Sequence, residues 1–213
     1  LISEIKSQDL VLYRPTHYGE KRSEFCKKVH GLKGFVINRN GLNIGNKGSF
    51  FDFCQQHHIP TPKTWYKNSF IQAATNSRIS KEMSFVIKKS ESSQGKGVFR
   101  AYDIQNCLEK INEMEDDIIV QEFCEMEQPI YDIRLMMVGT KLVGAMKRVL
   151  CSDDPLEFRS NLSLGNSVGE IYIPSTEMIE YAQKIQKNSL LDWVGIDVIV
   201  HQESFLFLEC NTS

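Results

Sequence analysis

The segment VGIDVIVHQESFLFLECN, Val194–Asn211, decides the fold that we expect for this chain. Two apolar runs, VGIDVIV and FLFLECN, flank the polar stretch HQES, a pattern typical of a β-hairpin. A hairpin that is symmetric about Glu203 places Asp197 directly opposite Glu209, with their Cβ atoms about 4.5–5.5 Å apart on one face. Asn211 lies two residues beyond Glu209 and therefore shares that face.

These three side chains predict a metal site. Two carboxylates held that close repel each other unless a proton or a cation lies between them. Asp197, Glu209 and Asn211 together offer three hard oxygen donors, the kind that Mg²⁺ prefers. A hairpin whose polar face simply meets solvent is the alternative interpretation, and the hairpin alone does not decide between the two.

The composition is that of a globular protein with a core of its own. The 213 residues, 41% hydrophobic and 24% charged, suffice for one large domain or two small ones. A formal net charge of −2 argues against a general nucleic-acid or anionic-membrane partner. No apolar run approaches the roughly 20 residues of a membrane helix, and nothing near Leu1 resembles a signal peptide. Because the chain opens on Leu1 and not on Met, we expect it to be part of a longer protein.

The cysteines indicate a reducing compartment. They are scattered and form no C-x-x-C pair, which is typical of cytosolic thiols and not of a disulfide or zinc framework. We therefore expect a cytoplasmic protein in which all six are free thiols without a catalytic role: Cys26, Cys54, Cys107, Cys124, Cys151 and Cys210. The sequence leaves the oligomeric state open, with a homo-oligomer among the possibilities.

Apolar periodicity predicts an α+β fold in which strands and helices alternate. Prolines and helical spacing indicate helices over 46–58, 104–114 and 174–190. Short apolar runs predict strands over 10–14, 34–39, 83–90, 97–103, 117–123, 132–139, 141–150, 194–200 and 205–210. A weak domain boundary is expected near residue 118.

Two further stretches have residues suited to binding phosphate. The loop in VIKKSESSQGKGVFR carries Gly95, and its backbone N–H groups could approach phosphate oxygens, while Lys88 ends the strand before it. Neither a Walker loop nor a G-x-G-x-x-G fingerprint is present, so an ordinary turn remains the alternative. Downstream, Arg148 and Arg159 are candidate clamps for carboxylate or phosphate, whereas we interpret Lys147 as a solvated surface charge.

Taken in order, the motifs resemble the ATP-grasp superfamily and, within it, the RimK-type carboxylate–amine (glutamate) ligases. The resemblance is carried by NKGSFFDFCQQHHIPTPKT, FVIKKSESSQGKGV, IIVQEF, YDIRLMMVG, AMKRV, EFRSNLSLG, VGIDVIV and FLECNTS, which span Asn46–Ser213. It implies two α+β lobes with ATP between them, preceded by a truncated α/β segment. The corresponding domains are 1–45, 46–117 and 118–213. The family usually continues after E-x-N with small residues and Pro-Gly, and this sequence stops at Ser213.

The resemblance also implies a role for each site residue. Lys47 and Lys88 would contact ATP, and the backbone of Gln121, Glu122 and Phe123 would read the adenine edge. Asp132 would lie near the nucleotide, Arg148 would clamp the transferred phosphate, and Mg²⁺, or Mn²⁺ in its place, would be held by the three hairpin residues. The phosphate end would be lined by Arg159, Ser160 and Asn161.

The implied activity is ATP-dependent formation of an amide bond through an acylphosphate. The substrates would be an amino-acid or peptide carboxylate and an amine, with glutamate addition to a peptide, protein or small molecule as the leading expectation. A non-catalytic ATP-binding regulatory or scaffold module with the same fold is the alternative. The presence of Asp197, Glu209 and Asn211, together with Arg148 and Arg159, favours the enzyme. A protein that no longer catalyses the reaction would tend to lose these residues.

Overall fold

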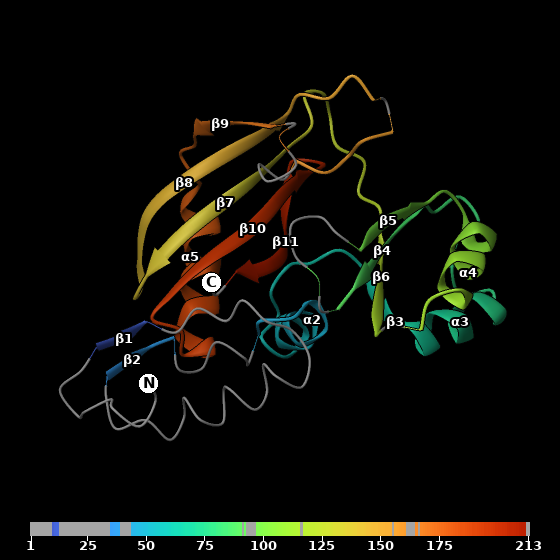
Figure 1. The fold of residues 1–213 in the computed structure, drawn as a ribbon, viewed down its shortest axis with the longest axis horizontal. Coiled ribbons are helices and arrows are strands. Elements are labelled where there is room, and N and C mark those ends of the chain that lie inside the picture. The colour runs from blue at the N-terminus through green and yellow to red at the C-terminus, as the bar shows by residue number, and fades with distance from the viewer. Residues whose placement is uncertain are drawn as a thin grey trace.

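The described residues form two antiparallel sheets with helices packed against them (Figure 1). This mixture confirms the expected α+β class. A short parallel pair, β1 (Leu10–Leu12) and β2 (Phe35–Ile37), adjoins them. The structure is a computed structural model that describes residues 10–12, 35–38, 44–90, 92, 97–115, 117–154, 156–160, 165 and 167–211.

The larger sheet has five strands in the order β11-β10-β7-β8-β9, and every neighbouring pair is antiparallel. Helix α5 (Thr176–Ser189) packs on one face through Met178, Ala182 and Ile185. Among the described residues no helix is both long and apolar enough to cross a membrane. The strands are β7 (Tyr131–Val138), β8 (Lys141–Leu150), β9 (Ser167–Ile171), β10 (Trp193–His201) and β11 (Ser204–Asn211).

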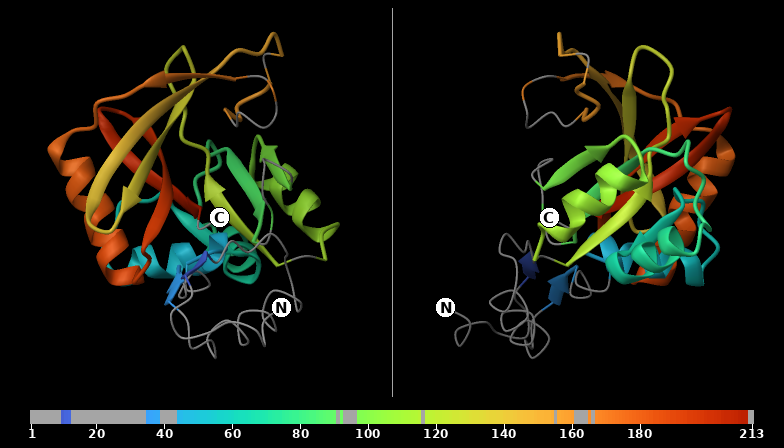
Figure 2. Two further views of the ribbon diagram at one scale, coloured as in Figure 1. Left: turned by 60° about the vertical axis from the view of Figure 1, so that its left-hand side comes forward. Right: turned by 90° about the vertical axis from the view of Figure 1, so that its right-hand side faces the viewer.

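The smaller sheet has four strands in the order β3-β6-β4-β5. Two helices, α3 (Lys67–Thr75) and α4 (Ile104–Asn112), cover one face of it (Figure 2). Phe70 of α3 packs edge-to-face on Phe85 of β4, with ring centroids 5.1 Å apart, at the centre of a separate apolar core. The strands are β3 (Thr64–Tyr66), β4 (Phe85–Lys89), β5 (Val98–Ala101) and β6 (Ile118–Glu122).

Helix α2 (Lys47–Gln56) lies between the two sheets. It begins at Asn46, whose side chain accepts a hydrogen bond from the Ser49 N–H, an N-cap that satisfies one of the free donors of the first turn. Phe50 and Phe53 are buried in the core of the larger sheet, whereas the ring of Phe51 contacts Tyr66 of β3. The helix therefore fixes the position of its first residue, Lys47, between the lobes.

The sheets divide the chain differently from the boundary expected near residue 118. Strand β6 pairs with β3 and β4 in the smaller sheet, and α2 packs on the core of the larger one. Sequence spacing predicted the helices at 46–58, 104–114 and 174–190. It missed α3 and the strands β3 and β9. Helix α3 has one fully buried residue, β3 has three residues that are only partly buried, and β9 is mostly exposed.

The terminal hairpin has the predicted pairing, since Asp197 lies opposite Glu209. The loop is shorter than HQES, because the strands run to His201 and from Ser204. Gln202 and Glu203 form the turn with φ angles of 48° and 63°, as a type I′ turn requires. A β-bulge next to Asp197 then adds a residue to β11 and restores the register that symmetry about Glu203 predicted.

Candidate functional site

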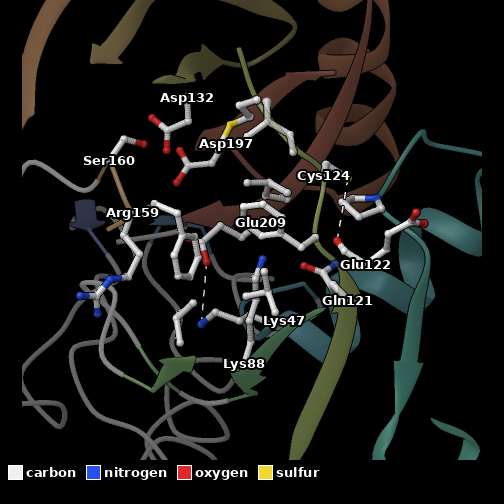
Figure 3. Close-up of a pocket in the computed structure, with 18 of the residues that line it drawn as sticks. Lys47, Lys88, Gln121, Glu122, Cys124, Asp132, Arg159, Ser160, Asp197 and Glu209 are labelled. Atoms are coloured by element: carbon white, nitrogen blue, oxygen red, sulfur yellow. Dashed lines mark hydrogen bonds and ion pairs between the residues drawn. The ribbon is translucent and has the colours of Figure 1, made fainter. Parts of the chain in front are cut away.

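A pocket lies between the two sheets and collects most of the predicted site residues (Figure 3). Its smaller-sheet wall comes from β4 and β6, and its larger-sheet wall comes from β7, β10 and β11, with Lys47 of α2 between them. The predicted residues that line it are Lys47, Lys88, Gln121, Glu122, Phe123, Asp132, Arg159, Ser160, Asp197 and Glu209.

Two lysines give one wall of the pocket a positive charge. The ammonium of Lys47 donates to the carbonyl of Ser92 over 2.6 Å and lies 3.8 Å from a carboxylate oxygen of Glu209. The ammonium of Lys88 makes no hydrogen bond or ion pair with the part of the chain that the structure describes. Burial lowers its pKa to about 8, although the nearby Glu209 opposes this shift. An anion bound beside Lys88 would therefore stabilise its charged form.

The opposite wall is a network of carboxylates and arginines. Arg134 donates from Nε and Nη2 to the two carboxylate oxygens of Asp197, each over 2.7 Å. Arg148 is almost fully buried, donates to both oxygens of Asp132, and its Nη2 also lies 3.1 Å from Asp197. Bidentate pairs of this kind fix planar groups in one orientation. The two aspartates are therefore held rigidly.

The network shifts the pKa values of its two aspartates in opposite directions. Burial raises the pKa of Asp132 to about 6, and Arg148 opposes the shift. Burial also disfavours the charged form of Asp197, but the hydrogen bonds and charges of Arg134 and Arg148 outweigh it and lower its pKa. Asp197 therefore remains an anion at neutral pH even though its side chain is buried.

Of the predicted magnesium ligands, Asp197 and Glu209 line the pocket, and Asn211 lies beside them. The amide of Asn211 donates to Asp197 over 3.2 Å and approaches Glu209 at 3.5 Å. No cluster of three or more His, Cys, Asp or Glu side chains suited to a metal occurs within the described ranges. The set of two carboxylates and one amide nevertheless fits Mg²⁺ chemically, because rotating the amide presents its oxygen in place of its nitrogen. Among the described residues no arginine pairs with Glu209, the predicted ligand that instead lies near Lys47.

The end of the pocket beside β6 is apolar and offers a free backbone edge. The N–H groups of Glu122 and Phe123 already donate to the carbonyls of Lys63 and Ser84, each over 2.8 Å. The next residue, Cys124, makes no backbone hydrogen bond through its N–H among the described residues. The Cys124 N–H is therefore open to a ligand, and the Glu122 carbonyl, which the Cys124 thiol approaches at 3.8 Å, can accept a further hydrogen bond. Both residues line the pocket, and Cys124 lies one residue beyond the expected segment.

Four predicted residues need separate comment. Arg148 does not line the pocket but lies behind Asp132 and Asp197, so clamping a phosphate would require these bonds to rearrange. Arg159 does line it, and its guanidinium is ion-paired with Glu157 at 2.6 Å. Two predictions, Gly95 and Asn161, lie outside the described residues.

Sequence reasoning assigned no role to Arg134 or Phe158. Arg134 belongs to the D-I-R motif, lies two residues after Asp132 on one strand face, and is the cross-strand neighbour of Asp197. Predicting the pairing of β7 with β10 would have revealed it. Phe158 lines the pocket from the segment between β8 and β9, and no local pattern marks it.

The thiol prediction is confirmed for the five cysteines that the structure describes: Cys54, Cys107, Cys124, Cys151 and Cys210 are all free. Burial raises the pKa of Cys124, the one that lines the pocket, to about 11. Its thiol is therefore protonated and a poor nucleophile at neutral pH. Cys26 lies outside the described residues.

The comparisons with known proteins define the class. The family model of the RimK-like ATP-grasp domain matches residues 45–213, so this chain belongs to that family. This confirms the resemblance found in the sequence. Among curated relatives, the probable alpha-L-glutamate ligase of Legionella pneumophila (strain Corby) is 37% identical over 131 residues, which are 60% of this chain and 42% of the relative. The aligned part therefore spans less than half the length of that protein.

Solved structures confirm the ATP-grasp fold. The D-alanyl-alanine synthetase A of Vibrio cholerae superposes with a TM-score of 0.68 at 12% identity, covering 98% of this chain and 72% of the other. The ATP-grasp ligase PsnB, solved with a precursor variant, Mg and ADP, gives a TM-score of 0.63 at 17% identity, covering 91% of this chain and 60% of the other.

Proposed function

We propose that this chain is the ATP-binding, catalytic portion of a carboxylate–amine ligase. The observation that carries the proposal is the pocket between the sheets. One wall presents the ammonium of Lys88, which has no partner among the described residues, and the other presents Asp197 and Glu209 with Asn211 beside them. Lysines suit the triphosphate of ATP, and the oxygen donors suit the Mg²⁺, or Mn²⁺, that accompanies it.

The apolar end of the pocket suits adenine. The exocyclic amino group of adenine donates and its neighbouring ring nitrogen accepts, which matches the Glu122 carbonyl and the Cys124 N–H. Val86 and Ile199 would enclose the ring planes. Lys47 and Lys88 would then meet the phosphates, at the cost of the bond between Lys47 and Ser92.

The reaction would have two steps. A substrate carboxylate oxygen attacks the γ-phosphorus of ATP, the bond to the β,γ-bridging oxygen breaks, and an acylphosphate and ADP form. A neutral amine then attacks the acyl carbon, inorganic phosphate leaves, and the nitrogen loses a proton to give the amide. When bound by Glu209, Asp197 and Asn211, the metal supplies charge neutralisation at the phosphate oxygens.

The chain's own residues would contribute position and charge. Lys88 and Lys47 hold the phosphates, and Arg134 and Arg148 hold Asp197 and Asp132 in fixed orientations. Such preorganised groups stabilise charge as it develops without having to reorient during the reaction. We propose amino acids or peptides as substrates, with glutamate first, because the curated relatives are named as glutamate ligases.

A phosphate-release screen tests the proposal. The full chain is mixed with ATP, Mg²⁺ and pairs of amino acids or peptides, and ADP and phosphate are measured together with the amide by mass spectrometry. We expect one ADP and one phosphate for each amide formed. ATP binding without ADP release for any pair would instead favour a non-catalytic module, an alternative that the saturation of Asp197 by two arginines supports.

A further inference from the structure

An aromatic contact beside the pocket joins the two lobes. Phe123 follows β6 of the smaller sheet, and Phe158 lies in the segment between β8 and β9 of the larger one. Their ring centroids are 5.6 Å apart and the rings are inclined at 84°, an edge-to-face arrangement. Both residues line the pocket, so the contact between the lobes lies at the site itself.

Arg100 of β5 supports the ring of Phe123 from behind. The central guanidinium carbon lies 3.8 Å from the ring centroid of Phe123 and 5.1 Å from that of Tyr102. The Nε of Arg100 is buried and has no hydrogen-bond partner within the described part of the chain. A guanidinium placed over aromatic rings in this way is stabilised by the negative faces of those rings. Arg100 is therefore positioned to hold Phe123.

The contact continues to the polar end of the pocket through the peptide chain. Phe158 is followed by Arg159 and Ser160, which both line the pocket (Figure 3). Ser160 is 5% exposed, and its side-chain hydrogen bond stabilises the charged form of Asp132. Fixing the ring of Phe158 therefore restricts the two residues that follow it.

We propose that Arg100, Phe123 and Phe158 form a clasp between the lobes that positions Arg159 and Ser160 against the phosphates of the bound nucleotide. Arg100 and Phe158 are positioning residues in this scheme, since Arg100 acts through Phe123 and Phe158 acts through the residues after it. The inference rests on the proposed function, because it assumes that a nucleotide occupies the pocket.

A double-mutant cycle tests the clasp. Arg100→Met keeps the length of the side chain without its charge, and Phe158→Leu keeps apolar volume without the ring edge. Calorimetry measures the affinity of each variant for a non-hydrolysable ATP analogue with Mg²⁺ and for adenosine. We expect each change to lower the affinity for the analogue about fivefold and the affinity for adenosine less than about twofold. The double variant should bind the analogue no more weakly than the weaker-binding single variant, because both changes disturb the ring contact of Phe123.

Matched controls separate the clasp from general damage. Arg78→Met removes an exposed arginine from the same lobe, and Phe99→Leu removes a ring that is 43% exposed on the neighbouring position of β5; both should bind normally. Phe158→Tyr keeps the ring and should restore binding if Phe158→Leu does not fold.

Three results would overturn the clasp: unchanged affinity for the analogue in both single variants, additive effects in the double variant, or an equal loss for adenosine. Failure of the unchanged chain to bind either compound would refute the proposed function, and the clasp with it. Normal binding by the unchanged chain together with normal binding by the variants refutes the clasp alone.

Discussion

The two walls of the pocket differ in how their charges are paired. On the larger sheet, Asp132 and Asp197 each accept two hydrogen bonds from an arginine. On the smaller sheet, Lys88 has no such partner within the described residues. Paired charges in fixed geometry are preorganised, whereas a buried unpaired ammonium is destabilised until an anion arrives. We therefore expect the larger sheet to provide rigidity and, under the proposed function, the smaller sheet to provide affinity for phosphate.

Removing the paired cation should have the largest effect. Arg148→Met leaves Asp132 without its bidentate partner, and we expect the free energy of unfolding to fall by about 3–5 kcal/mol at about pH 7.5. Losing Arg148 raises the pKa of Asp132 further above its unfolded value, so the folded state binds more protons and the deficit should shrink near pH 5.5.

Urea unfolding at both pH values checks this prediction. Arg159→Met is the matched control, since Arg159 is more exposed and pairs with Glu157 instead. Arg159→Met should lower the free energy of unfolding by less than about 1 kcal/mol. An equal loss in both variants would show that the larger-sheet wall has no special rigidity.

Glu209→Gln should abolish most metal binding while leaving the fold intact. It removes a carboxylate that pairs with no arginine of the described chain, so we expect the affinity for Mg²⁺ in the nucleotide complex to fall more than about 100-fold. Thermal stability in EDTA should barely change. The measurement is calorimetry with an ATP analogue, with and without Mg²⁺.

Glu203→Gln, in the turn of the same hairpin, is the control and should bind normally. Mg²⁺ affinity of Glu209→Gln within about tenfold of the unchanged chain would show that Glu209 is not a metal ligand and that the hairpin face is ordinary surface.

Lys88→Met should separate affinity from stability. The change removes one charged hydrogen bond to phosphate, and we expect affinity for an ATP analogue to fall about 10- to 100-fold. Because burial disfavours the ammonium, the nucleotide-free protein should melt at a higher temperature than the unchanged chain. Lys81→Met, an exposed change in the same lobe, should alter neither quantity. A lower melting temperature with normal affinity would contradict the assignment.

The smallest effect concerns pH. A bound phosphate would raise the lowered pKa of Lys88, so nucleotide binding takes up a proton above pH 8 and affinity falls as the pH rises through 8. The affinity for the nucleotide should then fall by up to about tenfold per pH unit. The stability of the nucleotide-free protein should change in the opposite direction. The pKa of Lys88 is about 8 in the folded state and 10.5 for a free lysine, so the folded state is disfavoured most below pH 8. This loss of folding free energy lessens as the pH rises from 8 to 10.5.

Calorimetry in two buffers of different ionisation enthalpy measures the proton uptake directly. Lys88→Arg keeps its charge throughout this range and should give a flat profile. A profile that is the same for both proteins would show that another group causes the decline.

Sequence patterns anticipated the parts that rest on local rules. Alternation placed Asp197 opposite Glu209, and the order of the motifs indicated the RimK-like family and its two lobes. Ten of the expected site residues also line one pocket, whereas Arg148 and Asn211 do not. Contacts between distant segments were not anticipated, because no local period encodes them. Arg134 reaches Asp197 across 63 positions, and Phe158 reaches Phe123 across the lobes.

The sequence by itself determined the family and the α+β class, since these follow from residue types at fixed spacings, and the same residue types led to the chemistry proposed for the site. The tertiary structure alone decided which charges are paired. Arg148 was expected at a phosphate, yet pairing of β7 with β8 and β10 buries it between two aspartates. In the smaller sheet, pairing of β4 with β5 and β6 leaves Lys88 lining the pocket. Ion pairs form only between groups a few ångströms apart, and strand pairing decides which side chains lie that close.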